Sequence, residues 1–421
     1  MRDDDPVHIT IFTLGSRGDV EPYLALGMGL VSAGHTVRLA THERYGPEIR
    51  DAGLEFSPAA GDPRHMMEGE AGRRWLESGR NPVRIMRRLL DVSGPIFQQY
   101  LEDCETAIGG TDAVLFSVLA FPAYHLAEAA RLPAIGAYLQ PMTRTRELPS
   151  LFMKSGGSRL LNLWSHIAVE QVTWQPLRRS VNRWREGLGL NPLPRSGLYR
   201  SIYKSMPVLY GFSPAVVPPP SDWPGQISVT GYWMRKASED RRPAERIVRF
   251  LQNGPAPIYV GFGSRPERQP KELAELVLAA IRQAKRRAVL LTGWGGLSTT
   301  DSSADVLVVD DVPHDWLFPQ MEAVVHHGGA GTTGTALQSG KPSIVVPSFA
   351  DQFFWAERVA ALGAGVNLPR RKLTTESLAG AIADTADADL CRKASALGAR
   401  LRAENGVERA VEKLGFLLGV R

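Results

Sequence analysis

The sequence predicts an α/β protein with two domains, each built around a parallel sheet that helices cover on both faces. Three observations support this prediction. The chain has 421 residues, a length that favours two hydrophobic cores over one. Short apolar runs of strand length alternate with segments of helical periodicity in both halves. A proline-rich stretch at residues 213–224 separates the halves, and proline is unsuited to a central strand because it lacks the backbone N–H.

The first half contains apolar runs that we interpret as strands, with helical segments between them. The predicted strands are residues 7–14, 36–41, 113–117 and 134–139. The predicted helices are residues 23–33 and 124–131. A strand, a helix and a further strand in succession indicate a parallel sheet, since parallel neighbours need a crossover connection.

Residues 143–200 break this alternation. They contain Trp164, Trp174 and Trp184 together with many arginines. The tryptophans fit either an ordinary hydrophobic core or a surface that touches a membrane or a lipophilic substrate.

The second half repeats the alternation. Its predicted strands are residues 258–262, 288–292, 306–309, 323–326 and 343–346. A helix is predicted at 271–285, and an amphipathic helix at 407–418 ends the chain, either capping the second domain or crossing back onto the first. The predicted organisation is a first domain at 1–218, a linker at 219–240, a second domain at 241–405 and a final helical segment at 406–421.

Composition narrows the function classes. Hydrophobic residues make up 43% and charged residues 22%, as in water-soluble globular proteins. Cys104 and Cys391 lie far apart in no metal-type spacing, which favours a reducing, cytoplasmic location over a disulfide framework. The net charge of +5 fits a solvated surface, or weak attraction to an anionic membrane or nucleotide. The aromatic–basic pattern of nucleic-acid binding is missing, so we expect no nucleic-acid partner.

Residues 326–333 read His-His-Gly-Gly-Ala-Gly-Thr-Thr, between a predicted strand and a helix expected from residue 334. Small residues let the backbone approach a ligand closely, and the N–H groups at a helix start attract an anion. Imidazole and hydroxyl groups add side-chain donors. The stretch therefore predicts a diphosphate site formed by the following residues: His327, Gly329, Ala330, Gly331 and Thr332. His326 is interpreted as the end of the buried strand or as a further ligand.

Asp351 and Gln352 follow the next predicted strand. A carboxylate and an amide accept and donate hydrogen bonds, which suits sugar hydroxyls. A diphosphate site followed by a sugar site predicts an enzyme that uses a nucleotide sugar.

Asp19 lies in the first strand-to-helix turn, where residues 15–22 read Gly-Ser-Arg-Gly-Asp-Val-Glu-Pro. The spacing is not the dinucleotide-binding fingerprint, because the third glycine is absent. Asp19 is either a helix N-cap or a general base that takes the proton from an acceptor hydroxyl. The leaving diphosphate then needs preorganised donors. Since no Asp-x-Asp pair lies near the phosphate turn, we expect catalysis without a metal ion.

Several motifs in order resemble one family, the sterol glucosyltransferases, which have two Rossmann-like domains facing across a cleft in the arrangement called GT-B. The first-half motifs are residues 15–23, 121–129 and 141–146, and the central ones are 212–218 and 222–224. The second-half motifs are 260–264, 312–319 and 326–333, with Asp351 and Gln352 after them. The first and the His-His-Gly-Gly motifs also occur in glycosyltransferases of antibiotic biosynthesis. Thr-Arg-Thr-Arg at 143–146 and Asp-Trp-Pro at 222–224 favour the sterol group.

The resemblance implies an inverting hexosyltransferase of the family 1 type, which uses UDP-glucose or another nucleoside-diphosphate sugar and no further cofactor. The acceptor is expected on the first domain and the donor on the second. Asp19 falls on the catalytic base, and Asp351 and Gln352 on the sugar-binding pair. The remaining residues expected at the donor are Ser16, Arg17, Gly18, Ser264, Val312 and His314. The residues expected to line the acceptor pocket are Phe116, Phe121, Tyr124, His125 and Met142, with a core role open for His125.

The chain departs from related plant enzymes at two points. Those enzymes carry a His where Asp19 stands, oriented by an Asp on a later strand, and the matching strand here ends at Ser117 without a carboxylate. An aspartate base needs no partner to fix its tautomer. The uracil-stacking Trp of the plant enzymes is replaced by Asp311, and Trp294 either stacks instead or belongs to the core.

The leading hypothesis is glucose transfer to a sterol, triterpenoid or other lipophilic alcohol, with weak peripheral membrane contact and closure of the two domains. One alternative is a dTDP-sugar-dependent enzyme that acts on a polyketide or glycopeptide. A second alternative is a catalytically silent accessory protein that binds sugar nucleotides.

Overall fold

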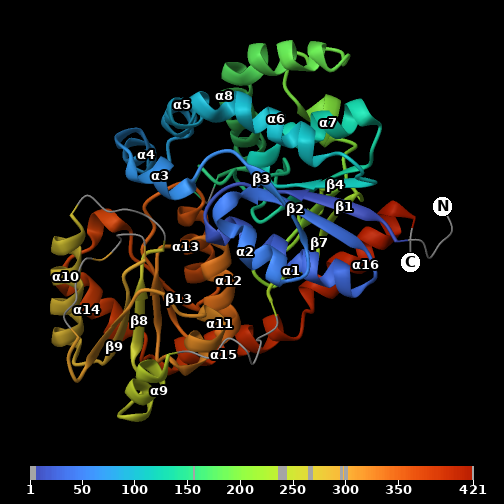
Figure 1. Cartoon of the computed structure of the whole chain (residues 1–421). Coiled ribbons are helices and arrows are strands. Elements are labelled where there is room, and N and C mark those ends of the chain that lie inside the picture. Colours follow the sequence, from blue (N-terminus) through green and yellow to red (C-terminus); the bar gives the residue numbers. More distant parts are fainter. Residues whose placement is uncertain are drawn as a thin grey trace. The chain divides into compact units, whose positions relative to one another are not determined.

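The computed structural model describes residues 6–154, 157–235, 244–263, 269–293, 297 and 302–419. The chain forms two compact units, and each unit is made of segments that are separated in the sequence (Figure 1). Unit 1 comprises Met1–Met66, Asn81–Arg235 and Glu404–Arg421, and unit 2 comprises Met67–Arg80 and Lys236–Ala403. The predicted domain boundaries therefore differ from the structure at both ends of the linker, and residues 67–80 belong to the other unit.

Unit 1 contains a seven-stranded parallel sheet in the order β3-β2-β1-β4-β5-β6-β7. Its strands are β1 His8–Phe12, β2 Thr36–His42, β3 Glu55–Ala59, β4 Ala113–Phe116, β5 Ala134–Tyr138, β6 Val208–Tyr210 and β7 Ile227–Val229. The four strands predicted for this half are confirmed. The linker predicted at 219–240 is wrong at β7, which forms the sheet edge and so needs ladder bonds on one side only.

The helices of unit 1 begin earlier than periodicity indicated. They are α1 Arg17–Ser32, α2 Gly46–Asp51, α5 Pro82–Ser93, α6 Phe97–Ala107, α7 Pro122–Ala130, α8 Arg159–Gly187 and α16 Gly406–Leu418, and α3 Pro63–Glu68 runs from unit 1 into unit 2. The final helix α16 packs on α1, as Figure 1 shows, so of its two predicted positions it takes the one on the first domain. Gly29 of α1 permits this contact, because a Cβ there would overlap the Val407 side chain.

Unit 2 contains a six-stranded parallel sheet in the order β10-β9-β8-β11-β12-β13. Its strands are β8 Ile258–Gly261, β9 Ala288–Leu291, β10 Val306–Val309, β11 Val324–His326, β12 Ser343–Val345 and β13 Gly365–Asn367. Its helices are α4 Glu70–Leu76, α9 Glu245–Gln252, α10 Pro270–Ala284, α11 His314–Leu317, α12 Ala330–Ser339, α13 Gln352–Ala361, α14 Thr375–Asp384 and α15 Ala388–Arg402.

The second sheet is buried on both faces. Successive residues of a strand point to opposite faces, so β8 and β9 contribute side chains to both core clusters. Val260 and Leu290 pack in one core cluster with residues of α10 and α14. Tyr259 and Val289 pack in another with residues of α9, α11 and α12. The carboxyl ends of these strands meet at one edge of the sheet, where α/β proteins bind their ligands.

Candidate functional site

Asp19 lies in the first turn of α1, just after the carboxyl end of β1. The N-cap is Ser16 rather than Asp19, since the helix begins at Arg17. The two residues form a capping box, in which Asp19 Oδ2 accepts hydrogen bonds from the Ser16 backbone N–H at 2.9 Å and from Ser16 Oγ at 3.0 Å. Among the described residues, no hydrogen bond reaches Asp19 Oδ1. The carboxylate is thus anchored through one oxygen, with the other available to a ligand.

The surroundings of Asp19 hold it in place and perturb its titration. Burial raises its pKa above the ordinary value, and the two hydrogen bonds from Ser16 act in the opposite direction. Gly15 has φ +132°, and a Cβ there would overlap the Asp19 carboxylate. The Gly15 N–H donates to Nε2 of His42 at 3.1 Å. Burial lowers the pKa of His42, so its ring is neutral and accepts this bond.

His42 is a supporting residue that the sequence reasoning missed. It ends β2, which lies beside β1 in the sheet, and only the topology reveals this proximity. The predicted donor residues Ser16, Arg17 and Gly18 also belong to unit 1, at the start of α1. The Arg17 guanidinium pairs with Glu21 at 3.6 Å and Glu48 at 3.8 Å. Donor contact by these three residues stays a prediction.

The predicted diphosphate turn joins β11 to α12 in unit 2. Helix α12 begins at Ala330 with Gly329 as its N-cap, four residues before the start expected from the sequence. Ala330, Gly331 and Thr332 therefore form its first turn, and the N–H groups there have no acceptor within the helix. An anion is favoured at this point by those donors and by the helix dipole.

The His327 imidazole lies between Gly329 of this turn and Gly263, which follows β8. A Cβ added to Gly329 would come within 2.6 Å of His327 Nε2, and one added to Gly263 within 2.5 Å of Cε1. Gly263 also has φ +75°, a conformation that favours glycine. These glycines thus make room for the His327 ring at the carboxyl edge of the sheet, beside the start of α12.

His326 is fully buried as the last residue of β11. Its Nδ1 accepts a hydrogen bond from the Gly328 N–H at 3.2 Å. Burial lowers the pKa of His326 to about 3, so the ring is neutral at physiological pH. Its place at the end of a buried strand agrees with the structural interpretation of this residue.

The predicted sugar-binding pair shapes its own loop. Gln352 Oε1 accepts hydrogen bonds from the backbone N–H groups of Ser348 at 3.0 Å and Phe349 at 3.1 Å. Asp351 is the N-cap of α13, and its Oδ2 accepts a hydrogen bond from Trp355 Nε1 at 3.1 Å. Ala350, directly before this pair, adopts φ +48°, which is unfavourable for an alanine, so the contacts of the loop must hold its backbone in a strained conformation.

The segment at residues 67–80 buttresses this loop within unit 2. The carbonyl of Gly79 accepts a hydrogen bond from the Ala350 N–H at 3.0 Å. The Trp75 ring meets Phe349 edge to face at a centroid distance of 5.0 Å. Arg80 pairs with Glu357 of α13 at 2.5 Å. These residues could not be predicted from the sequence, because their partners lie more than 270 positions away.

The segment expected to meet the nucleobase is built around His314 and Val312. His314 begins α11, its Nε2 lies 3.0 Å from the Tyr259 hydroxyl, and its ring stacks on Phe318 at 4.6 Å. Val312 is buried in the second core cluster of unit 2. Ser264 and Trp294 lie outside the described residues.

The predicted acceptor residues gather after β4 and β5 of unit 1. Phe116 ends β4 and contacts the rings of Tyr124 and Tyr138, each at 6.1 Å. Phe121, Tyr124 and Met142 are partly buried. The Met142 N–H donates to the hydroxyl of buried Tyr210 at 3.0 Å.

His125 belongs to a buried network. Its Nδ1 lies 2.8 Å from an Arg185 nitrogen, and Arg185 pairs with Glu128 at 2.6 Å. Burial is the main cause that lowers the pKa of His125 to about 4, and the positive charge of the nearby Arg185 lowers it as well. The neutral ring accepts from Arg185, which agrees with the core role left open for this residue.

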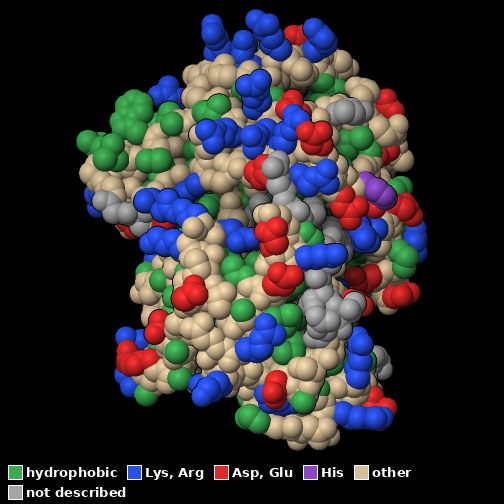
Figure 2. All heavy atoms as spheres, turned by 90° about the vertical axis from the view of Figure 1, so that its left-hand side faces the viewer, with side chains coloured by type: hydrophobic (Ala, Val, Ile, Leu, Met, Phe, Trp, Pro, Cys, Tyr) green, Lys and Arg blue, Asp and Glu red, His purple; other side chains and the backbone are tan. Residues whose placement is uncertain are grey.

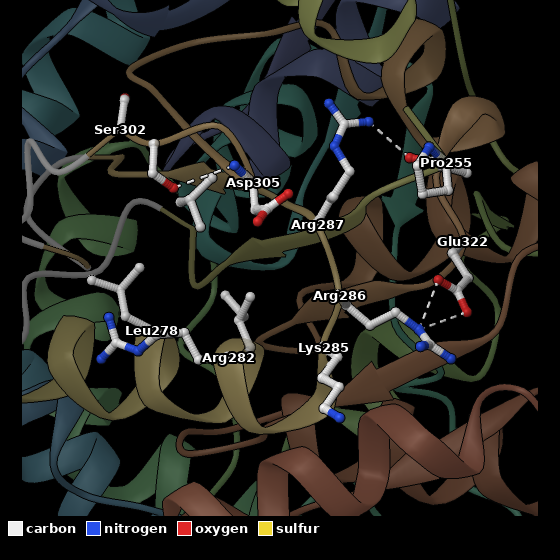
Figure 3. A pocket seen from close by; sticks show the side chains of 13 residues that line it. Pro255, Leu278, Arg282, Lys285, Arg286, Arg287, Ser302, Asp305 and Glu322 are labelled. Atoms are coloured by element: carbon white, nitrogen blue, oxygen red, sulfur yellow. Dashed lines mark hydrogen bonds and ion pairs between the residues drawn. The ribbon is translucent and has the colours of Figure 1, made fainter. Parts of the chain in front are cut away.

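A cavity of about 740 Å³ in unit 2 lies at the opposite edge of the sheet from the phosphate turn. Its lining residues Ala256, Arg287 and Asp305 stand at the amino ends of β8, β9 and β10. Figure 3 shows two of its arginines held by the protein itself, Arg286 by Glu322 at 3.1 Å and Arg287 by the Pro255 carbonyl at 2.9 Å. The cavity is therefore no part of the candidate donor site.

Two family models match the chain. Residues 9–149 match the glycosyltransferase family 28 N-terminal domain, and residues 295–410 match the C-terminal domain of erythromycin biosynthesis protein CIII-like proteins. The expected family 1 type is not confirmed, because the first match is to family 28.

Similar curated proteins align along nearly the whole chain. The sterol 3-beta-glucosyltransferase of Yarrowia lipolytica is 37% identical over 96% of this chain and 28% of its own length. That of Komagataella phaffii is 36% identical over 96% of this chain and 34% of its own. The UDP-sugar-dependent glycosyltransferase 52 of Dictyostelium discoideum is 34% identical over 97% of this chain and 26% of its own length. The chain thus spans about a third or less of the length of these relatives.

Solved structures of antibiotic glycosyltransferases share the fold. The kitacinnamycin glycosyltransferase superposes with a TM-score of 0.71 at 21% identity, covering 99% of this chain and 100% of its own. The calicheamicin glycosyltransferase CalG4 gives 0.71 at 18% identity, covering 99% of each chain. These likenesses establish the two-domain GT-B fold that was predicted. In the part of the chain that the structure describes, no helix has the length and apolar character needed to span a bilayer.

Proposed function

Because this chain has the GT-B fold of glycosyltransferases and is homologous over nearly its whole length to a part of the sterol 3-beta-glucosyltransferases, we propose that it glycosylates a lipophilic alcohol. The donor is a UDP-hexose, with glucose the expected sugar. The acceptor is a hydroxyl of a sterol or triterpenoid. Reaction proceeds with inversion and without a metal ion.

The observation that carries this proposal is the state of Asp19. One carboxylate oxygen is fixed by Ser16, and among the described residues nothing bonds to the other. The raised pKa makes this carboxylate a stronger base than an ordinary aspartate. An aspartate that served only as a cap would not need a second oxygen left open at the carboxyl end of a parallel sheet, where ligands bind.

In the proposed step, the acceptor oxygen attacks the anomeric carbon of the sugar while its proton passes to Asp19 Oδ1. The bond between the anomeric carbon and the diphosphate oxygen breaks, and its electron pair stays on the diphosphate. The growing negative charge is met by the N–H groups of the first turn of α12 and by His327. Because attack and departure occur on opposite faces of the carbon, the configuration inverts.

The sugar is positioned by the loop that carries Asp351 and Gln352. Gln352 Oε1 is occupied by two backbone N–H groups, so its amide nitrogen is the group that donates to a sugar hydroxyl. Asp351 supplies a carboxylate that accepts from sugar hydroxyls. The strained backbone at Ala350 and the support from residues 67–80 fix both side chains before the donor binds.

Two similarities support UDP as the nucleotide of the donor. They are the similarity to the UDP-sugar-dependent glycosyltransferase 52 and the similarity to the sterol 3-beta-glucosyltransferases. Calorimetric titration with UDP and with TDP tests this choice. We expect UDP to bind at least about tenfold more tightly. Equal or tighter binding of TDP would favour a deoxysugar donor instead.

The reaction itself is tested by incubating the purified chain with UDP-glucose and a panel of sterols, triterpenoids and other hydrophobic alcohols. Release of UDP and a product heavier by one hexose in mass spectrometry are expected, unchanged by EDTA. Absence of turnover with every hydrophobic alcohol would contradict the proposal. Donor binding without transfer to any acceptor class would favour an accessory role.

A further inference from the structure

The first two turns of α8 are inverted in polarity relative to an ordinary surface helix. Leu160, Leu161 and Trp164 are 62%, 62% and 63% exposed. On the opposite side of the same turns, Asn162, Ser165 and His166 are buried, with 6%, 7% and 7% exposed. A surface helix normally faces its apolar side to the core and its polar side to water.

The buried polar side chains are satisfied by the segment that precedes the helix. Asn162 Nδ2 donates to the Arg146 carbonyl at 3.0 Å. Ser165 Oγ accepts from the Ser150 N–H at 2.9 Å, and His166 Nε2 lies 3.0 Å from the Leu148 carbonyl. Since each of these polar groups has a partner, specific hydrogen bonds hold the polar side of the helix against the protein. The apolar side therefore faces outward.

The exposed apolar side chains are neighbours. Leu160 and Trp164 are four residues apart and Leu161 and Trp164 three, spacings that place side chains on one helical face. Met153 is also exposed, at 51%, a few residues before the helix. Isolated exposed apolar residues are common, whereas contiguous ones mark an interaction surface. We call Leu160, Leu161 and Trp164 the apolar face of α8.

A basic cavity of about 730 Å³ adjoins the same turns, lined on the helix side by Leu163 and Ile167. Its exposed cations are Arg146, Arg200 and Lys204, and among the described residues no carboxylate forms a salt bridge with them. The acidic lining residue Asp222 accepts hydrogen bonds from Thr145 and from the Arg146 N–H at 2.7 Å. Because this carboxylate can balance at most one of the three exposed cations, the cavity keeps an excess of positive charge suited to a phosphate group.

Positive charge is not confined to the cavity. Arg159, the first residue of the helix, is exposed, and so is Lys154 five residues before it. Figure 2 shows Lys and Arg side chains gathered over the end of the molecule where Figure 1 places α5 and α8. Apolar side chains thus project from a surface whose surroundings are cationic.

We propose that the apolar face of α8 and the basic cavity beside it form a docking surface for a bilayer that contains anionic phospholipids. Leu160, Leu161 and Trp164 enter the boundary between headgroups and acyl chains, where tryptophan is favoured. Arg146, Arg200 and Lys204 take up the lipid phosphates. An uncharged apolar partner would satisfy the apolar face alone, whereas an anionic lipid also satisfies the cations of the adjoining cavity. This inference goes beyond the proposed reaction and does not depend on which alcohol is glycosylated.

Co-sedimentation with vesicles tests the docking surface. We expect the chain to bind vesicles of phosphatidylcholine and phosphatidylserine, and to bind pure phosphatidylcholine at least about tenfold more weakly. The variant Leu160→Gln, Leu161→Gln, Trp164→Gln should lose at least about tenfold of the affinity for anionic vesicles, because three apolar side chains no longer leave water. Phe416→Gln is the matched control. Phe416 is 78% exposed on α16, and its replacement should leave vesicle binding unchanged.

A second variant separates charge from apolar contact. Arg200→Gln with Lys204→Gln should weaken binding to anionic vesicles about tenfold or more, and should reduce its sensitivity to salt. The absence of vesicle binding, or equal binding by the wild type and the triple glutamine variant, would overturn the proposal. So would a dimer in solution that the triple variant converts to a monomer, since the occupant would then be a second copy.

Failure of docking and failure of the reaction are distinguishable. Transfer to an acceptor dispersed in detergent should be unchanged in the triple glutamine variant, because none of its three positions is among the residues assigned to the candidate site. If that variant lost transfer in detergent while it kept vesicle binding, the apolar face would belong to the acceptor site and the docking surface would be refuted.

Discussion

At the scale of single residues, Asp19 serves both structure and the proposed chemistry. Its Oδ2 closes the capping box of α1 and its Oδ1 remains open. The motif and the carboxyl-edge rule made Asp19 predictable as a functional candidate from the sequence. The capping geometry was not predictable, because Pro22 lies inside the helix and made the helical pattern seem to begin at residue 23.

Asp19→Asn should lower kcat by roughly two to four orders of magnitude, the scale of general base catalysis. The asparagine oxygen still accepts from Ser16, so helix α1 should keep its cap and the melting temperature should change little. Steady-state kinetics and thermal unfolding measure these two quantities, and UDP titration should show that donor binding is nearly unchanged. Turnover at the wild-type rate would remove Asp19 from the mechanism.

Ser16→Ala should shift the acid side of the pH–rate profile upward. The proposed base acts when deprotonated, and burial already raises the pKa of Asp19. The Ser16 hydroxyl bond lowers that pKa, so its removal raises the pKa further and more of the base is protonated at low pH. The measurement is kcat/KM against pH. Ser32→Ala on the same helix removes a hydroxyl bonded to the Met28 carbonyl, and its profile should match the wild type.

At the scale of elements, the strands could be predicted from the sequence, whereas the first residues of the helices could not. Apolar runs identified β8, β9 and β11 because buried parallel strands are almost continuously apolar, and β1 was recognised although Thr10 lies at its centre. Helix α12 begins four residues before its predicted start, because two glycines and two threonines in its first half have low helix propensity. Tertiary packing at the phosphate turn outweighs that propensity, and it places the functional residues inside the helix rather than before it.

Gly329→Ala tests whether this element holds the diphosphate through His327. The backbone at Gly329 has φ −62°, so an alanine brings no torsional strain, but its Cβ would press on His327 Nε2. We expect the Kd for UDP to rise at least about tenfold through displacement of the ring, with a stability loss of about 1 kcal/mol or less. Gly380→Ala in α14, where a Cβ meets no atom within 4 Å, should leave both quantities unchanged or raise stability slightly.

At the scale of the whole molecule, each unit includes a segment that is distant in sequence from the rest of it. Residues 67–80 pack in unit 2, and residues 404–421 pack in unit 1. Periodicity within a window cannot report such partners, so neither the support of the Ala350 loop nor the choice between the two predicted positions of α16 could be predicted from the sequence. In α16, Ala410 and Leu414 are buried, and Ser213 Oγ donates to Glu404 at 2.6 Å.

Gly29→Ala should therefore destabilise the chain by about 1–3 kcal/mol, although alanine favours helices, because its Cβ would overlap Val407 and force α16 away. Gly187→Ala, at the end of α8 with open space around the Cβ, is the control and should have no such cost. Chemical denaturation measures the free energy of unfolding. Hydrogen exchange should locate the loss in α1 and α16, and protection lost evenly across both units would contradict this assignment.

The position of α16 also has a consequence for biosynthesis. A ribosome makes the strands of unit 1 first, then nearly all of unit 2, and only afterwards the helix that covers α1. Until that helix leaves the exit tunnel, the groove around Gly29 is open to chaperones or to the same helix of a neighbouring nascent chain. Unit 1 is thereby completed only after nearly all of unit 2 has been made, and slow decoding of the α16 codons would lengthen the exposure of α1.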